Sequence, residues 1–234
     1  MIHTAFVHDF SKLPAAGETD LHAIEAIGAE LAGSNRPFVV TSATAHLPQG
    51  RVGTEADAPA LDALARHRIA SEHKTLSLAA RGVRSSLLRL PPSVHGDGDH
   101  AFVPALIGVA RAKGVSGYIG AGLNRWAAVH CLDVARLFRL ALEKGAAGSR
   151  YHGVADEGVP IKDIATLIGQ RLDLPVVSKS AAEAGEHFGW LAHFLSVDCP
   201  TSSARTREQL GWQPTHPSLI ADLEHGSYFD RPDQ

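Results

Sequence analysis

The chain has 234 residues, 44% of them hydrophobic and 20% charged, which is enough to bury a sizeable core in one domain or one and a half. Its net charge is −3 with histidine neutral, and it has no run of lysine and arginine, so a nucleic-acid partner is excluded. We find neither a signal-peptide pattern nor an apolar run of bilayer length, and we therefore expect a soluble, cytoplasmic protein without a membrane partner.

Short apolar strands alternate with longer segments of helical period through the first two thirds of the chain. Residues 1–6 read as an interior strand, and further strands are expected at 38–41, 83–90 and 117–120. Helices are expected at 19–32, at 61–81 with a glycine stop at Gly82, at 102–113 and at 132–144. This order predicts a parallel sheet with crossover helices.

From about residue 149 the elements become shorter and are separated by proline and glycine. The pattern predicts strands at 151–154 and 175–177, helices at 161–172, 202–210 and 219–223, and a capping box from Ser180 to Glu183. We therefore expect a smaller mixed α/β lobe at the C-terminus.

Four segments carry a resemblance to a known family. Residues 89–99 (RLPPSVHGDGD) are similar to R-x-x-N-V-Y-G-P-G-D, and residues 124–135 (NRWAAVHCLDVA) are similar to a segment that ends in V-H-V-x-D-x-A. Residues 151–165 resemble the strand and helix that follow, and residues 203–214 (SARTREQLGWQP) resemble D-x-S-K-A-R…L-G-W-x-P. In this order they resemble the NAD(P)-dependent epimerase/dehydratase family, the extended short-chain dehydrogenase/reductases.

The resemblance implies a fold, a cofactor and a class of reaction. The fold is α/β, with part of a Rossmann-like parallel sheet in residues 1–148, substrate-lobe segments from about 96–130, and a smaller substrate-binding lobe in residues 149–234. The cofactor is NAD or NADP, and the reaction is hydride transfer at a carbonyl or alcohol carbon of a small or sugar-like substrate. A homodimer is left open.

Residues 1–6 resemble the fourth strand of the family, whose nucleotide is held by a G-x-x-G-x-x-G turn after the first strand. The chain contains no such turn. We therefore expect that Met1 is not the natural start and that the 234 residues bind NAD(P) weakly, because the backbone N–H donors that cradle the pyrophosphate are missing.

The catalytic positions depart from the family pattern. The family uses a Ser or Thr, for which Ser42 is the first candidate and Thr44 the second, together with a Tyr and a Lys in Y-x-x-S-K. That motif falls on residues 68–72 (RIASE), so Arg68 and Glu72 replace the catalytic pair. Arginine cannot act as a base. One interpretation is an ion pair at the surface or cleft edge; another has Arg68 orient an anionic substrate while Glu72 moves the proton; a third is misalignment.

Histidines are natural substitutes for the missing tyrosine, since imidazole titrates near neutral pH. His67 and His73 flank the altered pair, His95 stands where the family has a tyrosine, and His130 lies in the substrate segment. For each of these four histidines, the alternative interpretation is a purely structural role. The resemblance also assigns binding contacts: to the cofactor by Thr4, Ala5, Phe6, Thr41, Pro91, Pro92 and Ser93, and to the substrate by Ser93, His95, Arg125 and His130.

Two further patterns are rejected. Residues 96–101 satisfy G-x-G-x-x-A, but two prolines intervene after the strand, two aspartates repel a pyrophosphate, and no acidic residue follows to bind a ribose. The same segment is dense in His and Asp, which is common in polar turns, and Cys131 and Cys199 lack ligand spacing. No metal site and no disulfide is predicted.

Two function classes therefore compete with the oxidoreductase. A non-catalytic nucleotide-binding or sensor protein would keep the fold without the Tyr/Lys pair, and an inert fragment would have neither activity nor independent stability.

Overall fold

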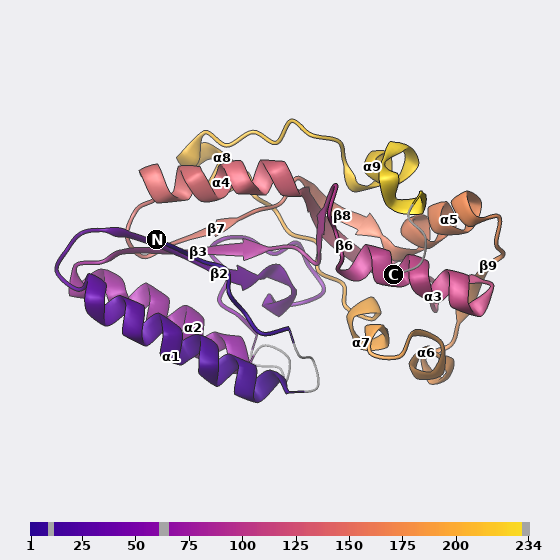
Figure 1. The fold of residues 1–234 in the computed structure, drawn as a ribbon, viewed down its shortest axis with the longest axis horizontal. Coiled ribbons are helices and arrows are strands. Elements are labelled where there is room, and N and C mark those ends of the chain that lie inside the picture. Colours follow the sequence, from indigo (N-terminus) through magenta and orange to yellow (C-terminus); the bar gives the residue numbers. More distant parts are fainter. Residues whose placement is uncertain (9–11, 61–65, 231–234) are drawn as a thin grey trace.

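The structure, a computed structural model, describes residues 1–8, 12–60 and 66–230. A parallel sheet covered by helices lies beside a smaller group of short strands and helices (Figure 1). No helix in the described ranges is long and apolar enough to cross a membrane.

The larger unit is built on a four-stranded parallel sheet with the strand order β1-β2-β3-β7. Its strands are β1 (Ile2–His3), β2 (Pro37–Ala43), β3 (Arg84–Leu90) and β7 (Ser149–His152). The expected first strand, residues 1–6, is wrong beyond His3. The backbone turns there, and the Phe6 amide donates to the Thr4 carbonyl at 3.0 Å, so Thr4 and Phe6 leave the sheet.

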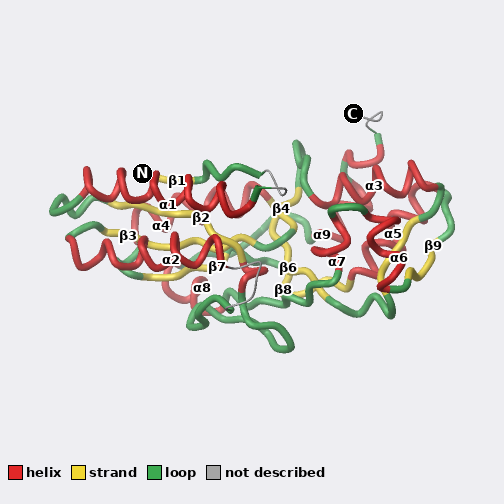
Figure 2. Tube along the Cα trace, turned by 90° about the horizontal axis from the view of Figure 1, so that it is seen from below, coloured by secondary structure: helices red, strands yellow, loops and turns green. Residues whose placement is uncertain are grey.

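Two helices, α1 (Leu13–Leu31) and α2 (Arg66–Ser77), lie side by side over one face of this sheet (Figures 1 and 2). Helix α1 starts earlier than expected because Pro14 occupies its first turn, where a missing N–H costs nothing. After α2, the short 3₁₀ helix η2 (Leu78–Arg81) ends at Gly82 with φ of 71°, which confirms the glycine stop. The beginning of the expected helix, residues 61–65, lies outside the described residues.

The opposite face of the sheet is covered by α4 (Cys131–Lys144) and α8 (Ala204–Leu210) (Figure 1). Successive side chains of β2 point alternately into two hydrophobic cores, one on each face of the sheet. Phe38 and Val40 pack toward α1 with Ile24, while Val39 packs toward α4 with Leu137. Because successive strand residues point to opposite faces, a strand covered on both sides is apolar throughout, as this one is.

The smaller unit contains a three-stranded mixed sheet, a two-stranded parallel pair and five helices among the described residues. The mixed sheet has the order β4-β6-β8, with β4 (Ser93–His95), β6 (Arg125–His130) and β8 (Asp156–Pro160), and β5 (Ser116–Ile119) pairs with β9 (Val176–Lys179). The helices are α3 (Phe102–Lys113), α5 (Ile161–Leu172), α6 (Ala181–Phe188), α7 (Leu191–Leu195) and α9 (Leu219–His225). Two more 3₁₀ turns are η1 (Thr44–His46) and η3 (Ser227–Phe229).

The α/β class, with a Rossmann-like parallel sheet and a smaller mixed lobe, is confirmed. Strand β7 pairs with β3 in the larger sheet and α8 contacts β7, so two elements after residue 148 belong to the larger unit, while the division into two domains at residue 148/149 stays a prediction. The Ser180 capping box is confirmed: Ser180 accepts from the Glu183 amide, and the Glu183 carboxylate accepts from the Ser180 amide.

Candidate functional site

A cavity of about 590 Å³ lies between the parallel sheet and the smaller unit. On the sheet side it is lined by residues that follow or end strands: Thr4 after β1, Ser42 in β2 and Pro91 after β3. On the other side it is lined by residues such as Phe102 of α3 and Trp126 of β6. Ligands of open parallel sheets bind beyond the carboxyl ends of the strands, and the volume is in the range of small-molecule sites.

The cavity brings together about half of the residues that the sequence assigns to a site. Those lining it are Thr4, Phe6, Thr41, Ser42, Arg68, Pro91 and Pro92. Those outside its lining are Ala5, Thr44, Glu72, Ser93, His95, Arg125 and His130.

Ser42 belongs to the lining of this cavity. Its side chain is buried, and within the described residues no hydrogen bond of regular geometry reaches its Oγ. The hydroxyl lies close enough to the Glu72 carboxylate to contribute to lowering the pKa of that group. Thr44 also has a buried hydroxyl without a partner in the described chain, but it does not belong to the cavity lining. Of the two candidates, only Ser42 is placed to meet a ligand.

Arg68 enters the cavity wall from α2. Its Nη2 donates to the Thr41 carbonyl at 2.7 Å, its Nη1 lies 3.5 Å from Asp20 Oδ2, and its guanidinium carbon is 4.0 Å from the centre of the Phe6 ring. Burial lowers the pKa of Arg68, while the Asp20 and Glu72 carboxylates act to raise it. The guanidinium is thus a fixed positive charge at the sheet side of the cavity.

Glu72 forms its ion pair with a different arginine from the one expected. Its two carboxylate oxygens accept from Arg89 Nε at 2.9 Å and Nη2 at 2.6 Å, with both side chains buried. The expectation of a surface pair between Arg68 and Glu72 is wrong, because this face of α2 packs on the sheet and turns both side chains inward. Burial acts to raise the pKa of Glu72, but the hydrogen bonds and charge of Arg89 outweigh it, so the pKa lies below its usual value.

Asp20 is a buried carboxylate that sequence reasoning missed. It lies in α1, accepts from Ser71 Oγ at 2.6 Å, and contacts His3 Nε2 at 2.9 Å in addition to Arg68. The sequence did contain a signal for its burial: Asp20 precedes the apolar Ile24 by one helical turn, so the two side chains share the buried face of α1. Together these groups hold Arg68 in place.

Histidines do line the cavity, but they are not the ones singled out from the sequence. His3, His8, His46 and His100 form part of its wall. His46, in η1, follows Ser42 by four residues, and its charge contributes to lowering the pKa of Glu72. Burial and Arg68 lower the pKa of His8. The position of His46 just beyond the strand that carries Ser42 was a signal available in the sequence.

The four histidines named from the sequence lie elsewhere or are not described. His73 is exposed on α2, and the side chain of His67 lies outside the described residues. His95 Nδ1 is 2.8 Å from Asp222 Oδ2, and its ring meets that of His130 edge-on with centres 5.4 Å apart. The His130 Nδ1 accepts from the Leu132 amide and so caps α4. These two rings join β4 and α4 to the C-terminal segment.

Arg125 and Ser93 are also engaged in the smaller unit. Arg125 makes a bidentate pair with Asp198, with Nε at 3.1 Å and Nη2 at 3.0 Å from its oxygens. Ser93 is buried in β4, where it pairs with Ala128 of β6. Neither side chain lines the cavity, so their assignment as binding residues stays a prediction without support from the geometry.

The aspartates of the polar turn at residues 96–101 also form hydrogen bonds within the protein. Asp97 accepts from Ser227 Oγ at 2.9 Å, and Asp99 accepts from Tyr228 Oη at 2.9 Å and from the Ala101 amide at 2.8 Å. Across residues 1–8, 12–60 and 66–230, no three His, Cys, Asp or Glu side chains are grouped to hold a metal ion. Cys131 and Cys199 are both free thiols.

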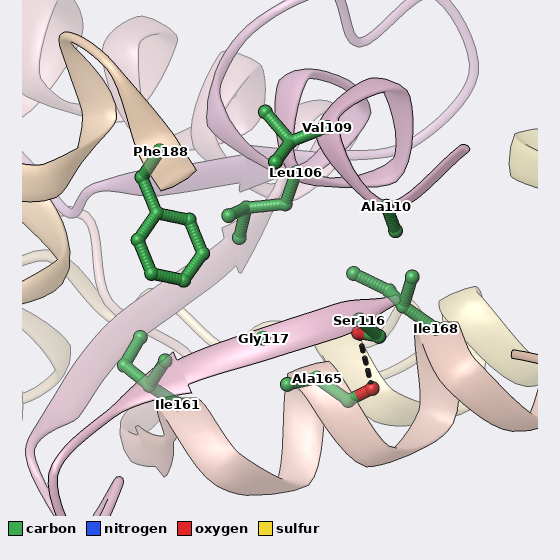
Figure 3. A pocket seen from close by; sticks show the side chains of 9 residues that line it. All are labelled: Leu106, Val109, Ala110, Ser116, Gly117, Ile161, Ala165, Ile168 and Phe188. Atoms are coloured by element: carbon green, nitrogen blue, oxygen red, sulfur yellow. Dashed lines mark hydrogen bonds between the residues drawn. The ribbon is translucent and has the colours of Figure 1, made fainter. Parts of the chain in front are cut away.

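A second, internal cavity lies between α3, β5 and α5 (Figure 3). Its volume is about 10 Å³, and the hydroxyl of Ser116 at its wall donates to the Ala165 carbonyl at 2.7 Å. A space of this size holds at most about one water molecule. It is a packing gap in the core of the smaller unit.

No family model matches the sequence. The chain is 57% identical over 230 residues to "Uncharacterized protein C2A9.02" of Schizosaccharomyces pombe, which covers 98% of this chain and 77% of that protein. It is 47% identical over 223 residues to "Uncharacterized protein YLL056C" of Saccharomyces cerevisiae, which covers 95% of this chain and 74% of that protein.

Solved structures match the fold along nearly the whole chain. The dTDP-glucose 4,6-dehydratase DesIV from Streptomyces venezuelae, with NAD bound, has a TM-score of 0.78 at 15% identity and covers 98% of this chain and 72% of its own. MoeE5 in complex with UDP-glucuronic acid and NAD has a TM-score of 0.76 at 18% identity, with coverage of 98% and 78%. The chain therefore belongs to one family with the two yeast proteins, and its structure matches the NAD(P)-dependent epimerase/dehydratases, the extended short-chain dehydrogenase/reductases.

Proposed function

We propose that the protein is an NAD(P)-dependent oxidoreductase that transfers a hydride to or from a carbonyl or alcohol carbon of a small substrate held in the 590 Å³ cavity. The observation that carries this proposal is the position of Ser42, His46 and Arg68, which line one cavity beyond the carboxyl ends of the parallel strands. Ligands of open parallel sheets bind at this edge.

The residues present fit the nicotinamide end of such a cofactor. Thr41 and Ser42 place hydroxyl-bearing residues in the cavity lining, and Phe6, Pro91 and Pro92 add apolar groups to it. This combination suits a flat ring with a polar amide. For the pyrophosphate, the 234 residues offer no G-x-x-G-x-x-G turn.

The chemistry divides among three side chains of the cavity. When bound, the nicotinamide supplies or accepts the hydride. Ser42 donates a hydrogen bond to the substrate oxygen and fixes its position. The positive charge of Arg68 stabilises the negative charge that develops on that oxygen, and the His46 imidazole gives or takes the proton.

Steady-state turnover tests the proposal directly. We expect slow oxidation of NADH or NADPH by simple aldehydes and ketones at high cofactor concentration, and we expect Ser42→Ala to lower its rate by about 10²–10³-fold. Absence of turnover with both nicotinamides across such a panel contradicts the proposal.

A second candidate is a nucleotide-binding or sensor protein without turnover. It is supported by the family's Tyr and Lys positions, which here hold Arg68 and Glu72, both engaged in buried ion pairs. Saturable binding of NAD(P) without any hydride transfer favours this candidate.

A further inference from the structure

Four aromatic side chains form a continuous surface on the smaller-unit side of the cavity. Phe102 lies at the centre of this aromatic wall, with ring centres 5.5 Å from Trp126, 5.7 Å from Trp190 and 4.8 Å from Phe194. Trp190 and Phe194 also meet edge-on at 5.9 Å. These residues come from α3, β6 and the segment around α7, so the tertiary fold assembles the wall. Trp126 is fully buried, so the accessible rings of the wall are Phe102, Trp190 and Phe194.

The aromatic wall offers area for packing but few hydrogen-bonding groups. The indole N–H of Trp126 already donates to the Phe194 carbonyl at 3.2 Å. The lining also contains the aliphatic residues Leu13, Leu90, Val94, Ala105 and Val197, and His100 is the polar lining residue that precedes Phe102 in the sequence. Polar groups of a ligand lying here would lose their bonds to water without replacement, which disfavours a sugar with its many hydroxyls.

The polar groups gather on the sheet side instead. Ser42, His46 and Arg68 lie there with Thr41 and Asp20. A ligand with one reactive oxygen and an apolar body is therefore oriented by the cavity, with its oxygen at Ser42 and its body on the aromatic wall.

The charges in the cavity do not suit a diphosphate. Arg68 is the single Lys or Arg among the described lining residues, and it already contacts the Thr41 carbonyl and Asp20. The other anion-binding feature, the N-terminus of α3, is occupied by Asp99, which accepts from the Ala101 amide and sets a negative charge there. A phosphate at this point would meet repulsion from the carboxylate.

We infer that the substrate is a neutral aldehyde, ketone or alcohol with an aromatic or aliphatic body, and that Phe102, Trp126, Trp190 and Phe194 determine this specificity. The inference rests on the proposed function for the reacting group. It separates this chain from a nucleoside-diphosphate sugar enzyme.

Tryptophan fluorescence measures binding without turnover. Two of the three tryptophans, Trp126 and Trp190, belong to the aromatic wall, while Trp212 is buried in the core beneath α4. We expect benzylacetone, a neutral aryl ketone, to change the emission saturably, and UDP-glucose at the same concentration to leave it unchanged.

Two wall variants and one control make the test specific. Phe194→Ala is expected to weaken benzylacetone binding by about tenfold or more, through loss of aromatic contact. Trp190→Ala should weaken benzylacetone binding by a similar factor. Because Trp190 is half-exposed, this variant should fold even if Phe194→Ala does not, and it keeps the test usable. Leu123→Ala, at an exposed residue outside the cavity, should bind as the wild type does.

UDP-glucose binding as tight as benzylacetone binding overturns the inference, as does ketone binding that is absent or indifferent to both wall variants. Failure of the proposed function looks different. In that case benzylacetone binds and depends on the wall, yet no hydride is transferred, and the ligand class stands without the reaction.

Discussion

Glu72 and Arg89 form a buried, bidentate ion pair that joins α2 to the centre of the parallel sheet. The Arg89 Nε and Nη2 donate to separate carboxylate oxygens at 2.9 and 2.6 Å, and Arg89 Nη1 donates to the Asp57 carbonyl at 2.9 Å. Arg89 is fully buried and Glu72 nearly so. The pair therefore anchors a helix to a strand, and Glu72 itself does not belong to the cavity lining.

Removing the charge of Glu72 should therefore destabilise the fold. We expect Glu72→Gln to lower the free energy of unfolding by about 3–5 kcal/mol, because it leaves the buried Arg89 guanidinium without its counter-charge. Urea denaturation measures this. Glu25→Gln, which breaks the exposed Lys74–Glu25 pair between α1 and α2, is the control and should leave the urea midpoint unchanged. A Glu72→Gln protein of wild-type stability that has lost turnover would restore a chemical role for Glu72.

The sequence showed that residues 68 and 72 share one helical face, but not what that face meets. Their partners are set by tertiary structure: Asp20 is 48 residues from Arg68, and Arg89 is 17 residues from Glu72. No local pattern encodes such pairings. The expected surface pair failed because charged residues are rarely buried, and only the packing of α2 on the sheet reveals that these are.

The sequence predicted most accurately those helices whose ends are marked by a residue that stops a helix. Helices α3 and α5 coincide with the expected ranges, and each ends at a left-handed residue, Gly114 or Asp173, that stops a helix through its own backbone. The length of strand β1 was overestimated because the chain leaves the sheet after His3, where Phe6 lines the cavity instead of extending the strand. Apolar patterning does not distinguish these two uses.

Ser42 should be needed for turnover and nearly neutral for stability. Ser42→Ala removes a hydroxyl whose polar neighbour is the Glu72 carboxylate, and Glu72 keeps both hydrogen bonds to Arg89, so the loss of stability should be small. We expect turnover to fall by about 10²–10³-fold, as when one oxyanion donor is removed. Ser85→Ala is the matched control, because Ser85 is equally buried and partnerless in the described chain but lies outside the cavity. Equal turnover in both variants would place the reacting oxygen elsewhere.

His46 is expected to move the proton. His46→Gln should lower kcat by about 10²–10⁴-fold, the usual contribution of a general acid or base, and should flatten the pH profile of kcat. The exposed His73→Gln on α2 serves as the control and should keep the wild-type profile. An unchanged pH profile in His46→Gln would assign the proton to another cavity group, such as His8 or His100.

Nicotinamide cofactors should bind this 234-residue chain weakly or undetectably in calorimetry. The cavity supplies hydroxyls and apolar walls for the nicotinamide end, but the sequence has no glycine-rich turn whose N–H groups hold the pyrophosphate. NAD and nicotinamide mononucleotide should therefore bind with similar affinity, because the adenosine half adds no contact. Tight, stoichiometric NAD binding would show that other residues of the chain replace the turn.

His152 should make stability depend on pH in the mildly acidic range. It is buried in β7, its Nδ1 donates to the Ser202 carbonyl at 2.9 Å, and its Nε2 lies 3.5 Å from Arg89 Nη1. Burial lowers the pKa of His152 from 6.5 to about 4, with the positive charge of Arg89 acting in the same direction. The folded protein therefore keeps this ring neutral at pH values where the unfolded chain protonates it.

Since the unfolded state binds the proton more readily, the free energy of unfolding should fall as the pH drops from about 6.5 to about 4 and then stop changing on account of this residue. Burial also lowers the pKa of His8, His130 and His187, which gives a slope of the same sign, so the comparison must be with a variant. Urea denaturation between pH 4 and 8 should show a shallower slope for His152→Gln, and parallel curves for the two proteins would mean that His152 does not titrate as its burial requires.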